Sequence, residues 1–165
     1  MSDRQTEHKT LLAPLRAAMY DFDTDGVRAA LNAVCDTDVQ FRLAFPFETT
    51  AGVDAYFDKA YAPLLAAIPD LERRDHIVMA GPTPDGNDWA GCGGYYTGTF
   101  QHPWLDIPPT GHIVHMRFHE FYRFDDGRVV EMQALWDIPV VMMQAGVWPM
   151  VPSLGREWHV PGPAT

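Results

Sequence analysis

The run VHMRFHEFYRF at residues 114–124 constrains the fold of this chain most, because its apolar and polar side chains alternate. Successive side chains of a β-strand point to opposite faces of a sheet, so a period of two predicts a strand with one buried face. That face is apolar or aromatic apart from Glu120. The strand therefore raises the question of what a carboxylate does among apolar side chains.

A second strand is predicted at residues 128–137, because it follows DDG, a strong signal for a β-hairpin turn. A slip of one residue would turn every side chain to the wrong face, so burial fixes the register. The register that joins the two apolar faces places the carboxylate near Met132, Ala134 and Trp136. The opposite face would then be a solvated charge ladder or a polar oligomer interface, in which Arg117, His119 and Arg123 lie beside Glu131, Gln133 and Asp137.

The rest of the chain predicts an α+β domain. Apolar spacing favours helices at residues 11–23, 23–34 and 49–70, the last kinked by Pro63, and a short helix at 137–144. Further strands are expected at 39–45, 71–80 and 89–100. Helices packed on one face of a strongly curved, mainly antiparallel sheet follow from this order. We expect one domain over residues 1–165, with a core of about 8–146 and an extended C-terminal tail at 147–165.

Composition excludes several classes of partner. The formal net charge is -10 and no cluster of Lys and Arg occurs, which argues against nucleic acid and anionic membranes. No apolar run approaches the roughly 18 residues of a membrane span. Two widely spaced cysteines are typical of reduced thiols, and the N-terminal residues do not resemble a signal peptide. We therefore expect a cytoplasmic protein.

Glu120 has two interpretations, because a carboxylate on an apolar face is costly unless it is paired, neutralised or hydrated. It is either a buried glutamate tied to Arg42, a histidine or a tyrosine, or a general acid/base in a ligand cavity. Asp137 likewise has two. It precedes IPVVMMQAG, so it could cap a helix or act in catalysis.

Four segments at fixed spacing carry a resemblance to a known family: WAGCGGYYTG, IPPTG, EFYRFDDGRVVE, and a D followed after six residues by QAG. Together they resemble the SnoaL-like polyketide cyclases of the nuclear-transport-factor-2-like superfamily, without gaps from residue 89 to 146. The resemblance implies a cone-shaped α+β barrel around an apolar pocket. It also implies closure of a polyketide ring by aldol condensation, with no metal or organic cofactor.

The resemblance also assigns residues, with one substantive departure. The family histidine falls on Glu120, and the family aspartate that moves the proton falls on Ala134, which cannot do so. Glu120 then supplies a carboxylate from across the hairpin. A shifted alignment that pairs LWD with the family's tryptophan–aspartate dipeptide would instead make Asp137 catalytic, at the expense of three extra strand residues.

The leading hypothesis is thus a cofactor-independent enzyme for a polyketide-like or ester carbonyl compound, with Glu120, or alternatively Asp137, as catalytic group. The predicted substrate-binding residues are Arg42, Tyr96, His112, Met116, Phe118, Tyr122, Met132, Ala134 and Trp136. The alternative is a non-catalytic binding protein for an apolar small molecule. We expect a homodimer, in which the apolar, proline-rich tail packs across a neighbouring subunit or the cavity mouth.

Overall fold

The fold was analysed in a computed structural model, which describes residues 3–151. Its helices are α1 (Asp3–Tyr20), α2 (Thr24–Val34), α3 (Val53–Tyr56), α4 (Ala62–Ala67) and α5 (Ile138–Gln144), with a π-helical segment η1 (Phe57–Tyr61) between α3 and α4. Its strands are β1 (Cys35–Leu43), β2 (Thr49–Ala51), β3 (Glu72–Pro82), β4 (Asp88–Thr99), β5 (Ile113–Asp125) and β6 (Arg128–Trp136). The predicted α+β class is confirmed.

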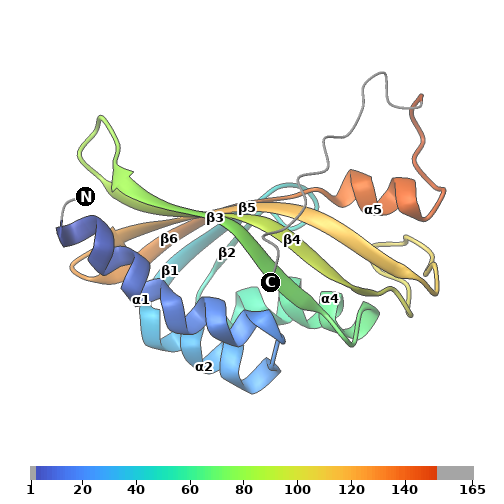
Figure 1. Ribbon diagram of the computed structural model, residues 1–165, viewed down its shortest axis with the longest axis horizontal. Coiled ribbons are helices and arrows are strands. Elements are labelled where there is room, and N and C mark those ends of the chain that lie inside the picture. Colours follow the sequence, from blue (N-terminus) through green and yellow to red (C-terminus); the bar gives the residue numbers. More distant parts are fainter. Residues whose placement is uncertain (1–2, 152–165) are drawn as a thin grey trace.

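The strands form one open sheet with the order β2-β1-β6-β5-β4-β3. All neighbours are antiparallel except β1 and β6, which run parallel. The helices α1, α2 and α4 lie beneath one face of the bent sheet, and α5 lies beside β5 at one end (Figure 1). The helices and the sheet thus enclose the core in the expected cone.

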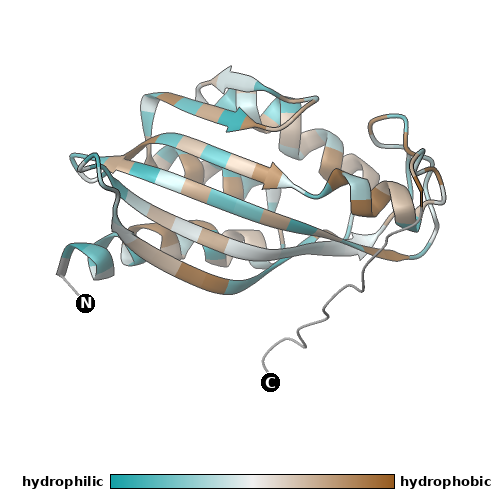
Figure 2. Ribbon diagram, turned by 90° about the horizontal axis from the view of Figure 1, so that it is seen from above, coloured by the Kyte–Doolittle hydropathy of each residue, from teal (hydrophilic) through white to brown (hydrophobic). Residues whose placement is uncertain are grey.

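The hairpin of β5 and β6 has the register that alternation predicts. Phe118 faces Trp136, and Glu120 faces Ala134. Every second residue of β5 from 114 to 124 is buried against the helices. Seen from above, hydrophobic and hydrophilic residues alternate along the strands (Figure 2). The face assignment from sequence is therefore confirmed.

The helix predicted at residues 49–70 is interrupted. Residues 49–51 form β2, and the helix begins only after Gly52, whose φ of 82° is readily accessible to glycine. It then widens into the π-helical segment, where the amide of Ala62 donates to the carbonyl oxygen of Phe57, five residues back. Pro63 follows directly and lacks an amide hydrogen, so α-helical bonding cannot pass through it unchanged. The predicted kink is thus a π-helical segment.

Two expectations concern the ends of the chain and membranes. The predicted docking of the tail lies mostly outside the described residues, because the structure describes the tail only as far as residue 151. Within residues 3–151, no helix combines the length and apolar character that crossing a membrane requires.

Candidate functional site

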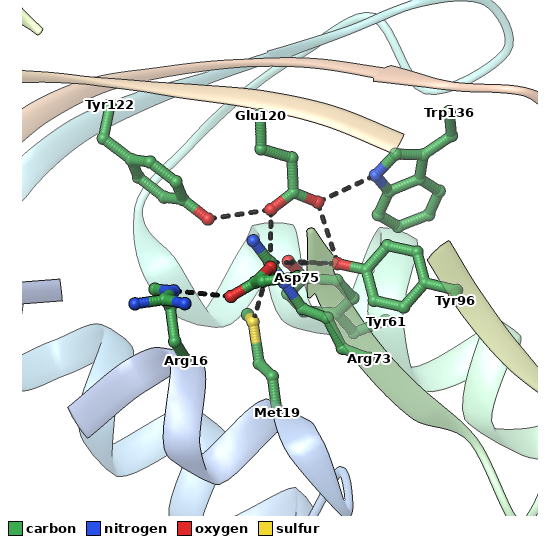
Figure 3. A network of polar contacts seen from close by, with 9 residues as sticks. All are labelled: Arg16, Met19, Tyr61, Arg73, Asp75, Tyr96, Glu120, Tyr122 and Trp136. Carbon is green, nitrogen blue, oxygen red and sulfur yellow. Dashed lines mark hydrogen bonds and ion pairs between the residues drawn. The ribbon is translucent and has the colours of Figure 1, made fainter. Parts of the chain in front are cut away.

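Glu120 lies in the middle of β5, on the face toward the helices, with no exposed surface. Four donors converge on its carboxylate (Figure 3). Oε1 accepts from the Tyr96 hydroxyl at 2.8 Å and from the Trp136 indole at 3.0 Å. Oε2 accepts from the Tyr122 hydroxyl at 2.8 Å and from Nη1 of Arg73 at 2.5 Å. Both oxygens are thus fully used, each by two donors.

Arg73 supplies the cation that the buried carboxylate requires. Its side chain projects from β3, and it is 1% exposed. Its Nε donates to Asp75 at 2.9 Å, and Arg16 of α1 donates to the other oxygen of Asp75 at 2.5 Å. Burial opposes the charge of Arg73, but Glu120, Tyr96, Tyr122 and Asp75 together outweigh it, so the pKa of Arg73 is raised. The guanidinium therefore stays charged.

Four buried tyrosines surround the ion pair: Tyr56, Tyr61, Tyr96 and Tyr122. The π-helical segment explains two of them, because its wider turn brings residues five apart onto one face. The rings of Tyr56 and Tyr61 accordingly meet edge to face, with centroids 4.9 Å apart. Burial, together with the neighbouring Tyr61 and Glu120, raises the pKa of the hydroxyls of Tyr56 and Tyr96 well above 10. Tyrosines in this state are neutral hydrogen-bond donors.

Some buried donors have no partner. Among the described residues these atoms are the Tyr56 hydroxyl, Nη2 of Arg73 and the indole nitrogen of Trp104. A buried donor without an acceptor costs about 1–3 kcal/mol. The first two belong to the tyrosine and arginine cluster around Glu120, so an acceptor oxygen from a ligand or a water would satisfy them. The site is therefore rich in donors, and the carboxylates of Glu120 and Asp75 are both already occupied.

The structure brings most of the predicted site residues together. Tyr96, Tyr122 and Trp136 bond to Glu120 directly. Four others are buried with it in the core: Met116, Phe118, Met132 and Ala134. These side chains belong to the hydrophobic core.

Three predicted residues lie elsewhere. The side chain of Arg42 is 57% exposed and pairs with Glu131 at 3.2 Å on the outer face, so it does not reach Glu120. His112 is exposed in the loop before β5. Asp137 caps α5 by accepting from the amide of Val140, and it pairs with Arg117 at 3.3 Å. Asp137 thus has the structural role that its position before the helix allowed.

Sequence reasoning missed four residues of the cluster: Tyr56, Tyr61, Arg73 and Asp75. Residues 73 and 75 alternate onto the face of the buried Leu71 just before β3, but the exposed residues 77 and 79 break this alternation. No group of three or more His, Cys, Asp or Glu suited to a metal occurs in the described part of the chain.

Comparisons with known proteins agree with this fold. The family model of the SnoaL-like polyketide cyclases matches residues 13–145. AclR from Streptomyces galilaeus, assigned as a hydroxylase, is 25% identical with a TM-score of 0.72, and the match covers 91% of each chain. A protein from Jannaschia sp. CCS1, assigned as a SnoaL-like polyketide cyclase, is 22% identical with a TM-score of 0.72, over 91% of this chain and 98% of that one. IdmH from Streptomyces antibioticus, assigned as a polyketide cyclase, is 19% identical with a TM-score of 0.68, over 85% and 99%. No curated protein sequence matches the chain.

Proposed function

Because this chain belongs to the SnoaL-like polyketide cyclase family, we propose that it is an enzyme acting on an apolar carbonyl compound, polyketide-like or an ester. The chemistry is proton transfer without a cofactor. The observation that carries the proposal is the fully buried carboxylate of Glu120 with tyrosine hydroxyls and a guanidinium at hydrogen-bonding distance. A buried carboxylate with specific charge partners is a candidate for acid/base catalysis.

In the proposed mechanism, Glu120 takes a proton from the carbon next to the substrate carbonyl. Both oxygens of Glu120 are occupied, so one donor must turn away first. A tyrosine hydroxyl can do this, because its hydrogen rotates, and it can then donate to the substrate oxygen instead. The unpartnered hydroxyl of Tyr56 and Nη2 of Arg73 are further donors for the developing enolate. Positioned acid/base catalysis of this kind contributes about 10²–10⁴-fold.

The alternative function is non-catalytic binding of an apolar small molecule, and two observations favour it. Four donors already saturate Glu120, which suits a structural ion pair as well as a base. In addition, Ala134 occupies the position at which the resemblance expects the proton-transferring aspartate. In this case Glu120 would only orient the donors around the ligand.

Native mass spectrometry of the purified protein, followed by incubation with any compound it retains, separates the two functions. Under the proposal, the compound is converted, and Tyr96→Phe slows its conversion by about tenfold or more. Tyr95→Phe is the matched control, because Tyr95 neighbours Tyr96 in the same strand but lies on the outer face. Retention of a compound without turnover would favour the binding protein. A Tyr96→Phe rate equal to that of the wild type would remove this cluster from the mechanism.

Asp137 remains the alternative catalytic group, and one substitution tests it. Asparagine caps helices about as well as aspartate, so Asp137→Asn should preserve the start of α5. The proposal expects turnover within about twofold of the wild type, since Asp137 lies outside the Glu120 cluster. Loss of turnover in a folded Asp137→Asn protein would transfer the catalytic role to Asp137.

We propose that the assembly is a homodimer formed through the outer face of the sheet. Exposed apolar side chains occur there on three strands: Ile77, Met79, Phe121 and Leu135. Gly91 lies between Met79 and Phe121 in the strand register. Because glycine has no side chain, nothing projects from the sheet between these two apolar residues. The arginines of this face pair with acidic residues of the same chain, which limits repulsion between two copies.

Light scattering of purified protein tests the dimer. Phe121→Glu should shift the mass to that of a monomer, because two copies of the charge would meet at a desolvated face. Tyr20→Glu, at the exposed end of α1 on the helical side, should leave the mass unchanged. An unchanged mass for Phe121→Glu would reject this interface.

The two buried, free thiols support a reducing compartment, and we propose the cytoplasm.

A further inference from the structure

A chain of alternating charges runs from the surface of α1 to Glu120. It begins at Arg16, whose side chain is 30% exposed, and passes through Asp75, which is 9% exposed. It continues through Arg73 to Glu120, which are 1% and 0% exposed. Figure 3 shows the four side chains in this order between α1 and β5. The proposed site is therefore connected to a partly exposed residue on a different element.

The geometry of Arg73 makes this connection directional. A guanidinium is a rigid planar fork, so fixing one nitrogen fixes where the others point. Asp75 holds Nε at 2.9 Å, and the same plane then aims Nη1 at Glu120, at 2.5 Å. Nη2 is left without a partner. Asp75 thus decides which nitrogen faces the carboxylate and which remains available.

The position of Asp75 depends on an irregularity of β3. The pairing of β3 with β4 shifts between Asp75 and Ile77. A bulge of this kind redirects side chains locally and interrupts alternation. Before it, Arg73 and Asp75 point toward the helices, and after it Ile77 is exposed. The bulge lies where α1 packs on β3, which brings Asp75 within reach of Arg16.

We propose that Asp75 and Arg16 are positioning residues for the Glu120 site. They hold the Arg73 fork so that Nη1 binds Glu120 and Nη2 is left as a buried, open donor. The inference rests on the proposed function, since it assigns these residues to that site. The two arginines balance the two carboxylates, so neutralising Arg16 or Asp75 leaves an uncompensated charge in the chain.

The Trp136 indole reports on this arrangement without any substrate, because its N–H donates to Oε1 of Glu120. We would record the indole signals of ¹⁵N-labelled protein and their hydrogen exchange, assigning Trp136 through Trp136→Phe. Asp75→Asn and Arg16→Gln should shift this signal and speed its exchange by about tenfold, as expected when about one net hydrogen bond is lost. The signals of Trp89 and Trp104 should not move, which excludes general unfolding.

Arg4→Gln is the matched control. Arg4 also lies on α1 and pairs with a strand residue, Asp88, at 3.1 Å, but both side chains are near the surface and lead to no buried charge. Arg4→Gln should leave the Trp136 signal unchanged. Arg16→Lys keeps the charge beside Asp75, so its Trp136 signal should be close to that of the wild type. A Trp136 signal that is unchanged in both Asp75→Asn and Arg16→Gln would overturn the inference. If Trp136 responds but no compound is turned over, the positioning role stands and the proposed enzyme function fails.

Discussion

Replacing Glu120 by glutamine perturbs the network at its centre with almost no change of shape. Glutamine offers one acceptor oxygen and one amide nitrogen, whereas the carboxylate offers two acceptor oxygens. Whichever way the amide is turned, its nitrogen faces two of the four donors, Tyr96 and Trp136 in one orientation and Tyr122 and Arg73 in the other. The tyrosine hydroxyl of each pair can turn and accept from the amide, but the indole or the guanidinium cannot.

The expected loss of stability follows from these contacts. Each buried donor left without an acceptor costs about 1–3 kcal/mol. Arg73 in addition loses its innermost counter-charge, and removing one partner of a buried ion pair costs about 3–5 kcal/mol. When the amide nitrogen faces Arg73, the two contributions overlap because they share that residue, and we then expect a total of about 3–5 kcal/mol. That is a large share of the free energy of unfolding of a typical domain, which is about 5–15 kcal/mol.

Urea unfolding, followed by circular dichroism and tryptophan fluorescence, measures this loss. Arg73→Met should be similarly destabilising, and the double variant should cost about 1–3 kcal/mol less than the sum, because each single change strands the other partner. Glu131→Gln is the control. Glu131 lies on the outer face of β6 and pairs there with Arg42 and Arg123, so this substitution should cost about 1 kcal/mol or less. A Glu120→Gln protein within about 1 kcal/mol of the wild type would refute the buried network.

Three further outcomes follow from local contacts. Burial raises the pKa of Cys35 to about 12 and that of Cys92 to about 11, so a thiol reagent at pH 8, roughly, should label neither before unfolding and both after it. Hydrogen bonds from the side chain and amide of Thr99 lower the pKa of Asp70, so Thr99→Val should raise that pKa in an NMR titration. The accompanying loss of stability should be present at neutral pH and vanish as the pH falls through the folded pKa. A methyl group on Gly94 would lie 1.9 Å from a carbonyl oxygen of β3, so Gly94→Ala should destabilise by about 3 kcal/mol in the same urea assay.

Alternation carried most of the fold prediction, because it depends only on which side chains are buried. It gave the strands of the β5–β6 hairpin to within a residue or two, and it identified Glu120 as the buried exception. The helix over 49–70 was less accurate. Its apolar stripe is compatible with both α-helical and π-helical spacing. The residue pattern therefore does not reveal the change from α-helical to π-helical hydrogen bonding just before Pro63.

The partner of Glu120 could not be identified in the same way. Arg42 and Arg73 both lie on predicted strands, and composition does not distinguish them. Arg42 follows Phe41, which is buried, so strict alternation already turns it outward. The same alternation, counted from the buried Leu71, turns Arg73 inward. It would also turn Ile77 and Met79 inward, but these two residues are exposed. Only the bulge after Asp75 reconciles these residues, and a bulge leaves no periodic signal.

The polar interior itself argues that the cluster is more than a support for the fold. Replacing a buried ion pair by apolar side chains of similar volume is often neutral or stabilising. A core required only for stability could therefore dispense with Glu120 and Arg73. Instead this chain buries both, surrounds them with tyrosine hydroxyls, and leaves Tyr56 and Nη2 of Arg73 without acceptors. Each of these donors would be satisfied by an acceptor oxygen, and this supports the carbonyl ligand that we propose.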